Sequence, residues 1–377
     1  MIRYGIIGCG SMGREHIENL FALGGGDGGV QVTALADPHP ASLQTSLLAC
    51  AQALRPAPQA FTDHRELLAS GLCDAVVIAT PNHTHAALLR DALALPALHI
   101  LVEKPLVTRI EDGVDLLQRD QGRSGIVWVG QEYRYMPPVA ELLRMAHGGD
   151  VGRIHQVAIR EHRAPFYPKV GDWNRFNANT GGTLVEKCCH YFNLMDLLLG
   201  ENPLRVFASG AQRVNHLDEV YAGRRSDILD SAYCVLEYPS GARAMLDLCM
   251  FAEGSMDNEH LTVVGDAGKL ESMLPSGELR HSRREDWGRK QYWGQASGTG
   301  KGVSVKRVQD PHIKYLGNHF GASFVEHQRF AAAIRNGTPP EIPLQEGLRA
   351  VATGLAAHKS IDEGRVVAMS EVLPAGW

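Results

Sequence analysis

Residues 186–190, Glu-Lys-Cys-Cys-His, place a carboxylate, an ammonium, two thiols and an imidazole at five consecutive positions. These groups could bind a metal, supply a nucleophilic thiol, or provide an acid and a base for proton transfer. The surrounding segment 183–200 is rich in apolar residues and ends in glycine, which predicts a helix. In a helix Glu186 and His190 share one face, with Asn193 roughly in line. An imidazole oriented by a carboxylate can remove a proton from a substrate hydroxyl.

The two thiols argue against a metal site. Cys188 and Cys189 are adjacent, so on a helix they point about 100° apart and cannot both face one ion together with His190. The sequence also lacks a C-x-x-C pair that could complete a site. We therefore predict no metal, and we interpret both cysteines as small buried apolar residues rather than nucleophiles.

A glycine-rich turn near the start of the chain predicts a dinucleotide site. It follows the apolar run 2–7 and opens a segment with helical spacing of apolar residues. Gly8 permits a tight turn, Gly10 lets the backbone approach a pyrophosphate, and Gly13 lets helix and strand pack closely. The helix N-terminus offers unpaired N–H groups to the phosphates. The predicted cofactor-binding residues of this turn are Gly8, Cys9, Gly10, Ser11, Met12 and Gly13.

The second predicted strand, residues 30–37, ends at Asp37. An acidic side chain there accepts hydrogen bonds from the adenosine ribose hydroxyls and repels a 2′-phosphate. It comes a few residues later than the usual spacing of about 20, and the glycine-rich stretch 24–29 accounts for the difference. No arginine follows in residues 38–42, so NAD is favoured over NADP. A solvated aspartate at a strand end is the alternative interpretation.

The elements that position these residues alternate between strand and helix. After residue 37 we expect helices over 62–70, 83–93 and 108–120, and strands over 74–80, 99–105 and 125–135. This rhythm predicts a doubly wound parallel sheet, in which ligands lie beyond the carboxyl ends of the strands. Two polar clusters follow such strand ends and are candidates for cofactor contact: Thr80-Pro81-Asn82 and Glu103-Lys104-Pro105.

The second half of the chain predicts a different, mostly antiparallel sheet. Strand patterns follow one another without intervening helices over residues 152–163, 204–214, 231–251 and 259–272. The segment 286–312 is irregular, and we predict a long loop there.

With these pieces in order, the chain resembles the Gfo/Idh/MocA family, the glucose–fructose oxidoreductase and inositol dehydrogenase group. The resemblance covers essentially the whole chain. It implies an α/β protein with a Rossmann domain over residues 1–130 and a substrate-binding and oligomerisation domain over 131–377, built on a large open sheet. The closing helices, 319–363, would pack back toward the first domain. The segments that carry the resemblance are the glycine turn and residues 80–85, 102–106, 133–137, 181–200 and 324–367.

The resemblance also implies roles for individual residues. Lys104 matches the family's catalytic lysine, whose ammonium can stabilise negative charge developing on a reacting oxygen. Glu186 and His190 match the family's acid and histidine. The nicotinamide side would be flanked by Thr80, Pro81, Asn82 and His85, with Glu103, Lys104 and Pro105 reaching toward nicotinamide and substrate. Further substrate contacts are implied for Arg134, Tyr135, Trp173, Arg175, Asn177, Asn193 and His319, although a structural role for several of them stays open.

The motif departs from the family pattern at three positions. The family's order is aspartate, glycine, histidine and aspartate, where this chain has Glu186, Cys188, His190 and Asn193. The histidine is kept, the first acid is one methylene longer, and the last acid loses its charge. These departures leave the substrate more open than the chemistry.

We therefore expect an NAD-dependent dehydrogenase that oxidises a secondary hydroxyl of a sugar, inositol or sugar-derived ring. His190 would act as general base and Lys104 would stabilise the alkoxide. Two alternatives stay open: a redox-neutral NAD-dependent enzyme of the same family that cleaves a glycoside, and a non-catalytic NAD-binding regulator. The regulator is disfavoured because the lysine and the histidine are both present.

Composition bounds the partners. A net charge of −5 argues against a nucleic-acid partner. The apolar runs are too short for a membrane span, and the first residues lack the pattern of a secretory signal. Seven cysteines without scaffold spacing predict a reduced, cytoplasmic protein. A homodimer or homotetramer is expected by resemblance alone.

Overall fold

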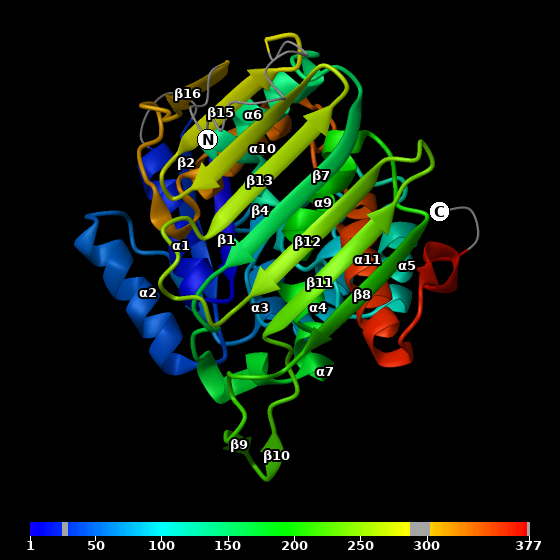
Figure 1. Ribbon diagram of the computed structural model, residues 1–377. Coiled ribbons are helices and arrows are strands. Elements are labelled where there is room, and N and C mark those ends of the chain that lie inside the picture. Colours follow the sequence, from blue (N-terminus) through cyan, green and yellow to red (C-terminus); the bar gives the residue numbers. More distant parts are fainter. Residues whose placement is uncertain (25–28, 287–301, 375–377) are drawn as a thin grey trace. The chain divides into compact units, whose positions relative to one another are not determined.

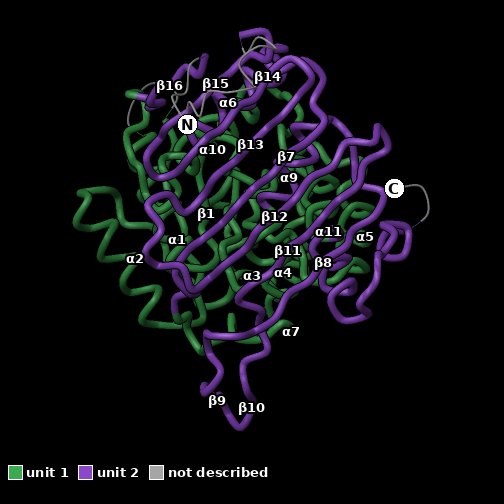
Figure 2. The backbone as a smooth tube through the Cα atoms, viewed as in Figure 1, with its two compact units in different colours: residues 1–135, 168–189, 311–351 green, residues 136–167, 190–310, 352–377 purple. Residues whose placement is uncertain are grey.

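A computed structural model describes residues 1–24, 29–286 and 302–374 of the chain (Figure 1). The chain forms two compact units, each assembled from separate stretches of sequence (Figure 2). Unit 1 contains residues 1–135, 168–189 and 311–351, and unit 2 contains residues 136–167, 190–310 and 352–377.

Unit 1 is built on a six-stranded parallel sheet in the order β3-β2-β1-β4-β5-β6. This is the strand order of a Rossmann fold, and it confirms the predicted doubly wound domain. The central strands are continuous apolar runs because helices cover both faces of such a sheet. The strands are β1 (Ile2–Ile7), β2 (Val30–Ala36), β3 (Gln59–Phe61), β4 (Ala75–Ile78), β5 (His99–Glu103) and β6 (Val127–Gly130).

The helices of unit 1 come from all three of its stretches. From the first stretch come α1 (Ser11–Leu23), α2 (Pro40–Gln52), α3 (His64–Ala69), α4 (His85–Leu93) and α5 (Ile110–Arg119). The second stretch adds α7 (Asn177–Thr180) and α8 (Thr183–Glu186), and the third adds α10 (Ala322–Asn336) and the start of α11 (Leu344–Glu363). Helix α10 contacts α1, so residues more than 300 positions apart lie side by side.

Unit 2 is built on a nine-stranded sheet in the order β16-β15-β14-β13-β7-β12-β11-β8-β17. All neighbouring pairs are antiparallel except β7 and β12, which confirms the predicted mostly antiparallel sheet. Its strands are β7 (Ile154–His162), β8 (Arg205–Ala211), β11 (Ser231–Glu237), β12 (Arg243–Cys249), β13 (Glu259–Gly265), β14 (Gly268–Leu274), β15 (Glu278–Arg283), β16 (Val303–Arg307) and β17 (Val367–Ala368). Helices α6 (Pro137–His147) and α9 (Cys189–Leu199) and a short hairpin of β9 (Val220–Tyr221) and β10 (Arg224–Arg225) complete the unit.

Strand β7 shows how one face of this sheet is buried and the other is polar. Val157 and Ile159 are buried, whereas Arg160 and His162 alternate with them on the opposite face. Alternation of this kind is typical of an antiparallel sheet with one face on the core. We refer to the face that carries Arg160 and His162 as the outer face.

Three predicted elements differ from the structure. The strand predicted over 125–135 ends at Gly130, and Glu132–Tyr135 form a 3-10 helix. The predicted loop 286–312 contains strand β16, which pairs with β15, and the rest of the prediction over 287–301 lies outside the described residues. The single helix predicted over 183–200 is interrupted at Lys187–Cys188, because α8 ends at Glu186 and α9 begins at Cys189.

The predicted domain boundary between residues 130 and 131 stays a prediction. Unit 1 contains stretches of the chain from both sides of that boundary, so the compact units do not correspond to two consecutive segments. Within unit 1, α10 packs on α1, and the expected return of the closing helices toward the first domain stays a prediction. Among the helices of the described residues, none has the length and hydropathy of a membrane-spanning segment.

Candidate active site

The glycine turn between β1 and α1 has the shape that a bound pyrophosphate requires. Gly8 has a φ of +95°, and a Cβ there would lie 2.6 Å from the Ala79 carbonyl oxygen. A Cβ on Gly13 would lie 1.9 Å from the Gly8 carbonyl oxygen, so helix and strand are in backbone contact. Around Gly10, by contrast, no atom lies within 4 Å of the position of an added Cβ. The turn therefore fits a dinucleotide, with open space at the middle glycine.

Asp37 closes the turn from the end of β2. Its carboxylate accepts hydrogen bonds from the Cys9 backbone N–H at 2.7 Å and from the His39 backbone N–H at 2.7 Å. These bonds hold the carboxylate beside the glycine turn, where a ribose would lie. Burial raises the pKa of the Cys9 thiol to about 12, with a further contribution from Asp37, so this cysteine is protonated and unreactive.

The loops after β4 and β5 are joined by His85. Its Nδ1 lies 2.8 Å from the Pro105 carbonyl oxygen and its Nε2 lies 2.9 Å from the Thr80 carbonyl oxygen. Burial lowers the pKa of His85, so the imidazole is neutral near pH 7. Asn82, also buried, donates from Nδ2 to the Thr180 carbonyl oxygen at 3.4 Å. These contacts fix the two loops that were predicted to reach the nicotinamide.

Lys104 is held as an ammonium. Burial by itself lowers the pKa of Lys104, but Cys189, Glu103, Glu132 and Glu186 act in the opposite direction and the net pKa lies above the ordinary value. Its Nζ donates to the Glu186 carbonyl oxygen at 3.2 Å, and its backbone N–H donates to the Glu103 carboxylate at 3.2 Å. A positive charge at this place suits the stabilisation of an alkoxide.

Behind Glu103 lies a buried chain of polar side chains that sequence reasoning missed. Glu103 Oε1 is 2.8 Å from His16 Nε2, and His16 Nδ1 is 2.9 Å from His327 Nε2 on α10. Burial, with His16 adding to it, lowers the pKa of His327 well below its ordinary value, so that ring is neutral. The signal available in the sequence was polar residues such as His16 within a segment that has the helical spacing of apolar residues. The sequence does not reveal their partners, which are distant along the chain.

A second buried group surrounds His319. Its Nδ1 is 2.9 Å from Glu15 Oε1, and its Nε2 is 3.7 Å from Glu132 Oε1. Burial raises the pKa of Glu132 to about 7, against the opposing effect of His319. Although burial tends to raise the pKa of Glu15, the hydrogen bond and charge of His319 lower it to about 2. The structure thus places His319 in a network of carboxylates.

The segment 186–190 is locally different from the prediction. The turn at Lys187–Cys188 interrupts the predicted continuous helix between Glu186 and His190, and the pairing of these two side chains stays a prediction. Glu186 belongs to unit 1 and His190 to unit 2, and both side chains are buried. Cys188 and Cys189 are fully buried, in agreement with their interpretation as packing residues.

Several predicted substrate residues already make contacts within the chain. Arg134 Nη2 donates to Glu346 Oε2 at 2.6 Å, and Tyr135 Oη donates to Glu341 Oε2 at 2.9 Å. Trp173 lies near His83, with ring centroids 6.3 Å apart. Of the other predicted substrate residues, Arg175 and Asn193 are buried, the latter on α9. Asn177 is half-buried at the start of α7.

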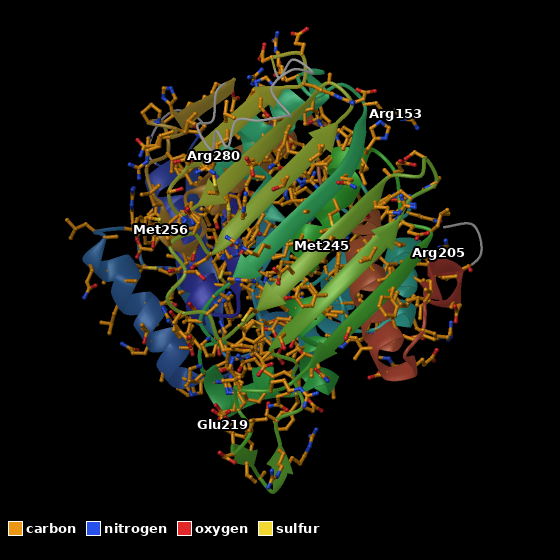
Figure 3. All side chains as sticks on the ribbon, viewed as in Figure 1. Arg153, Arg205, Glu219, Met245, Met256 and Arg280 are labelled. Atoms are coloured by element: carbon orange, nitrogen blue, oxygen red, sulfur yellow. The ribbon has the colours of Figure 1, made fainter. Side chains whose placement is uncertain are left out.

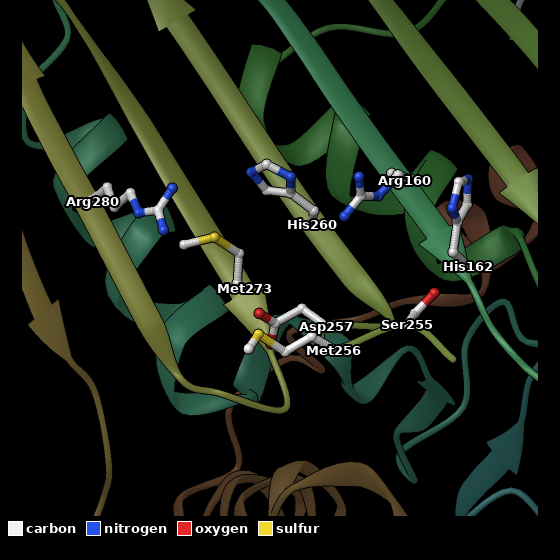
Figure 4. A pocket seen from close by; sticks show the side chains of 8 residues that line it. All are labelled: Arg160, His162, Ser255, Met256, Asp257, His260, Met273 and Arg280. Carbon is white, nitrogen blue, oxygen red and sulfur yellow. The ribbon is translucent and has the colours of Figure 1, made fainter. Parts of the chain in front are cut away.

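No set of three His, Cys, Asp or Glu side chains within the described residues is arranged to hold a metal ion. A cavity of about 380 Å³ lies on the outer face of the unit 2 sheet, lined in part by Arg160, His260 and Arg280 (Figure 4). It contains none of the predicted catalytic residues.

Comparison with known proteins assigns the chain to a family. A model described as "Oxidoreductase family, NAD-binding Rossmann fold" matches residues 2–131, and one described as "Oxidoreductase family, C-terminal alpha/beta domain" matches residues 145–369. The chain belongs to the Gfo/Idh/MocA oxidoreductase family. As a Gfo/Idh/MocA protein it is an NAD-dependent oxidoreductase, in agreement with the glycine turn and Asp37.

Among the Gfo/Idh/MocA relatives are proteins named for inositol oxidation. The myo-inositol 2-dehydrogenase of Thermotoga maritima is 25% identical, over 99% of this chain and 100% of its own length. The inositol 2-dehydrogenase of Rhizobium meliloti is 26% identical, over 98% and 99%. A solved levoglucosan dehydrogenase in complex with NADH and levoglucosan has the same fold, with a TM-score of 0.81, 19% identity, and 98% and 99% of the two chains covered.

Proposed function

We propose that this chain oxidises a secondary hydroxyl of a sugar, inositol or sugar-derived ring. The observation that carries the proposal is the Lys104 ammonium, which is half-buried, hydrogen-bonded to the Glu186 carbonyl oxygen, and located after β5 on the loop tied to Thr80 by His85. NAD, held by the glycine turn and Asp37, supplies the hydride acceptor when bound. The names of the relatives support a ring polyol as substrate.

The chain's own residues would handle the proton and the charge. We assign His190 as the general base that takes the hydroxyl proton, because an imidazole ordinarily titrates near neutral pH. Glu186 would orient that imidazole, and Lys104 would stabilise the alkoxide that precedes hydride loss. The proposed substrate contacts are Lys104, Arg134, Tyr135, Trp173, Arg175, Asn177, Glu186, His190, Asn193 and His319.

The test is a screen for NAD reduction with named ring compounds: myo-inositol, scyllo-inositol, levoglucosan and common aldohexoses. Replacing Lys104 by Met should lower kcat by about 100- to 1,000-fold, the range for loss of one charge-stabilising group. Replacing His190 by Ala should lower it by about 100-fold or more. Both variants should bind NADH, measured by its fluorescence, within a factor of about three.

Matched controls come from exposed residues of the same types. Lys314→Met and His155→Ala change side chains that face solvent, so both variants should keep the wild-type kcat. Unchanged turnover in both Lys104→Met and His190→Ala would refute the assignment. Cleavage of a glycoside with no net NADH would instead indicate the redox-neutral chemistry, and NAD binding without any turnover would indicate a regulator.

We also propose that the chain forms a homodimer or homotetramer through the outer face of the unit 2 sheet. A row of exposed apolar side chains crosses three neighbouring strands there, formed by Phe207, Val235 and Met245 in direct register. Figure 3 shows Met245 in the middle of this sheet. Exposed apolar rows of this kind are typical of protein interfaces. A Val235→Glu variant should shift the mass measured by light scattering to that of a monomer, while a Val170→Glu variant should not.

The last proposals concern partners other than the substrate and NAD, and the place where the protein acts. We propose that no nucleic acid, membrane or metal is required for activity, and that the protein acts in the cytoplasm. A stable preparation whose turnover is unaffected by EDTA would support the absence of a metal requirement.

A further inference from the structure

Lys187 is a buried lysine that the proposed reaction does not use. It occupies the turn between α8 and α9, and only 5% of its surface is exposed. Its Nζ donates to the Tyr133 hydroxyl at 2.6 Å and lies 4.9 Å from the centre of the Tyr133 ring. Removing an ammonium from water is costly, so a lysine is retained at such a position only where it is well bound. A short charge-assisted hydrogen bond with a ring contact provides that binding.

The two ends of this bond belong to two parts of unit 1 that matter for Lys104. Tyr133 lies in the 3-10 helix that follows β6, next to Glu132 and with its ring centroid 6.0 Å from that of His319. Lys187 directly follows Glu186, whose carbonyl oxygen accepts the hydrogen bond from Lys104 Nζ. The turn is therefore held from two sides, by Lys104 from the β5 loop and by Tyr133 from the β6 loop.

A directional bond at this place has a geometric consequence. The orientation of the Glu186 carbonyl depends on the backbone of the turn, and the turn is anchored by the Lys187 side chain. If that anchor is lost, an apolar residue could fill the same space, but it would not fix the direction of the carbonyl. Buried ion and polar pairs often add little stability compared with apolar residues of the same size, so orientation is the property that this pair can supply.

We propose that Lys187 and Tyr133 are positioning residues for the proposed dehydrogenase reaction. Their hydrogen bond holds the turn at residues 187–188, so that the Glu186 carbonyl orients the Lys104 ammonium toward the reacting oxygen. Neither residue exchanges a proton with the substrate in this mechanism. The inference rests on the proposed function, because it assigns to the pair a role in the step that Lys104 assists.

The test compares Lys187→Met, Tyr133→Phe and the double variant with wild type. Met fills nearly the same volume as the lysine stem, and Phe removes only the hydroxyl. We expect kcat to fall about 10- to 100-fold in each single variant, since a displacement of about 1 Å at a reacting group has effects of that size. The double variant should fall no further than the worse single variant, because both changes break one bond. KM for NAD and the NADH affinity should stay within about twofold.

Two readouts separate positioning from a purely structural role. The melting temperature of the double variant Lys187→Met/Tyr133→Phe should equal or exceed that of wild type, since replacing both partners of a buried polar pair by apolar residues is often neutral or stabilising. The primary deuterium isotope effect on kcat is measured with substrate deuterated at the oxidised carbon. It should be larger in the variants than in wild type, because misplacing Lys104 slows the chemical step. Partial misfolding would lower the amount of active enzyme and leave that isotope effect unchanged. The substrate is myo-inositol, or the compound with the highest turnover in the screen above.

Lys314→Met and Tyr167→Phe, which alter exposed side chains, are the matched controls and should behave as wild type. Wild-type kcat in both single variants overturns the inference while leaving the proposed function intact. A fall in kcat that comes with a lower melting temperature and an unchanged isotope effect also overturns it, because it identifies a structural role. A wild-type protein that reduces NAD with none of the ring compounds overturns the proposed function and this inference together.

Discussion

The glycine turn allows a prediction in which two neighbouring glycines respond to the same substitution in opposite ways. Gly10 has φ −71° and ψ −158°, an extended conformation that alanine adopts readily, and the space around its missing side chain is open. Gly13 lies inside α1, and an added methyl group would be 1.9 Å from the Gly8 carbonyl oxygen. Alanine at Gly10 should therefore disturb only the bound dinucleotide, and alanine at Gly13 should disturb the fold.

The sizes follow from this geometry. At Gly10, alanine restricts the unfolded chain and should raise the free energy of unfolding by about 0.4–1 kcal/mol. Its methyl group would occupy the approach of the pyrophosphate and weaken NADH binding at least about tenfold, or roughly 1.4 kcal/mol. At Gly13 the two backbones must separate by about 1 Å. Overpacking of this kind costs about 1–3 kcal/mol, which corresponds to a fall in melting temperature of about 2–4 °C for each kcal/mol.

Both variants can be measured by thermal melting without ligand and by titration of NADH fluorescence. Gly254→Ala is the matched control, because its position is exposed and has no atom within 4 Å of an added Cβ. It should change neither quantity. A Gly10→Ala variant that binds NADH like wild type would contradict the placement of the pyrophosphate at this turn. A Gly13→Ala variant that melts at the wild-type temperature would contradict the close helix–strand contact.

Three further predictions concern buried groups. Glu15→Gln should lower the free energy of unfolding near pH 7 by about 2–3 kcal/mol, because the pKa of Glu15 is depressed to about 2. Melting measured as a function of pH should show this difference from wild type shrinking as the pH falls from about 4.5 toward 2. Glu132 has a raised pKa of about 7, so its protonated form favours the fold and that contribution is lost as the pH rises through 7. Glu132→Gln should therefore stabilise the protein by about 1–3 kcal/mol at about pH 8 and have no effect below about pH 4.5. In native protein a water-soluble thiol reagent should modify the half-buried Cys73 and leave the fully buried Cys188 intact, as read by peptide mass spectrometry. Equal labelling would show that the turn between α8 and α9 opens readily.

Much of the fold could be predicted because its signals are local. Continuous apolar runs predict the buried parallel strands, the glycine turn predicts the entry to α1, and alternation predicts strands such as β7. The elements that the sequence did not reveal have weak local signals. Strand β16 is an edge strand whose side chains are mostly exposed, and β3 has only three residues.

The candidate site was predicted less completely, because its organisation depends on tertiary contacts. Helical spacing predicts one continuous helix through Glu186 and His190, but the helix is interrupted at Lys187–Cys188, and the Lys187 side chain bonds to Tyr133. No periodicity in a sequence reports a partner 54 residues away. The contact between His16 and His327 was missed for the same reason, since it joins residues separated by 311 positions.

That last contact bears on how the protein is made. Helix α1 is synthesised before its partners Glu103, His319 and His327, and His327 follows His16 by 311 positions. Until α10 has been synthesised, the polar groups of α1 lack their partners on that helix, so the nucleotide-binding unit cannot reach its final packing. A nascent or truncated chain that stops near residue 130 would leave this surface of α1 exposed, where chaperones and proteases could reach it. Full NAD binding should therefore be acquired only after α10 has been synthesised.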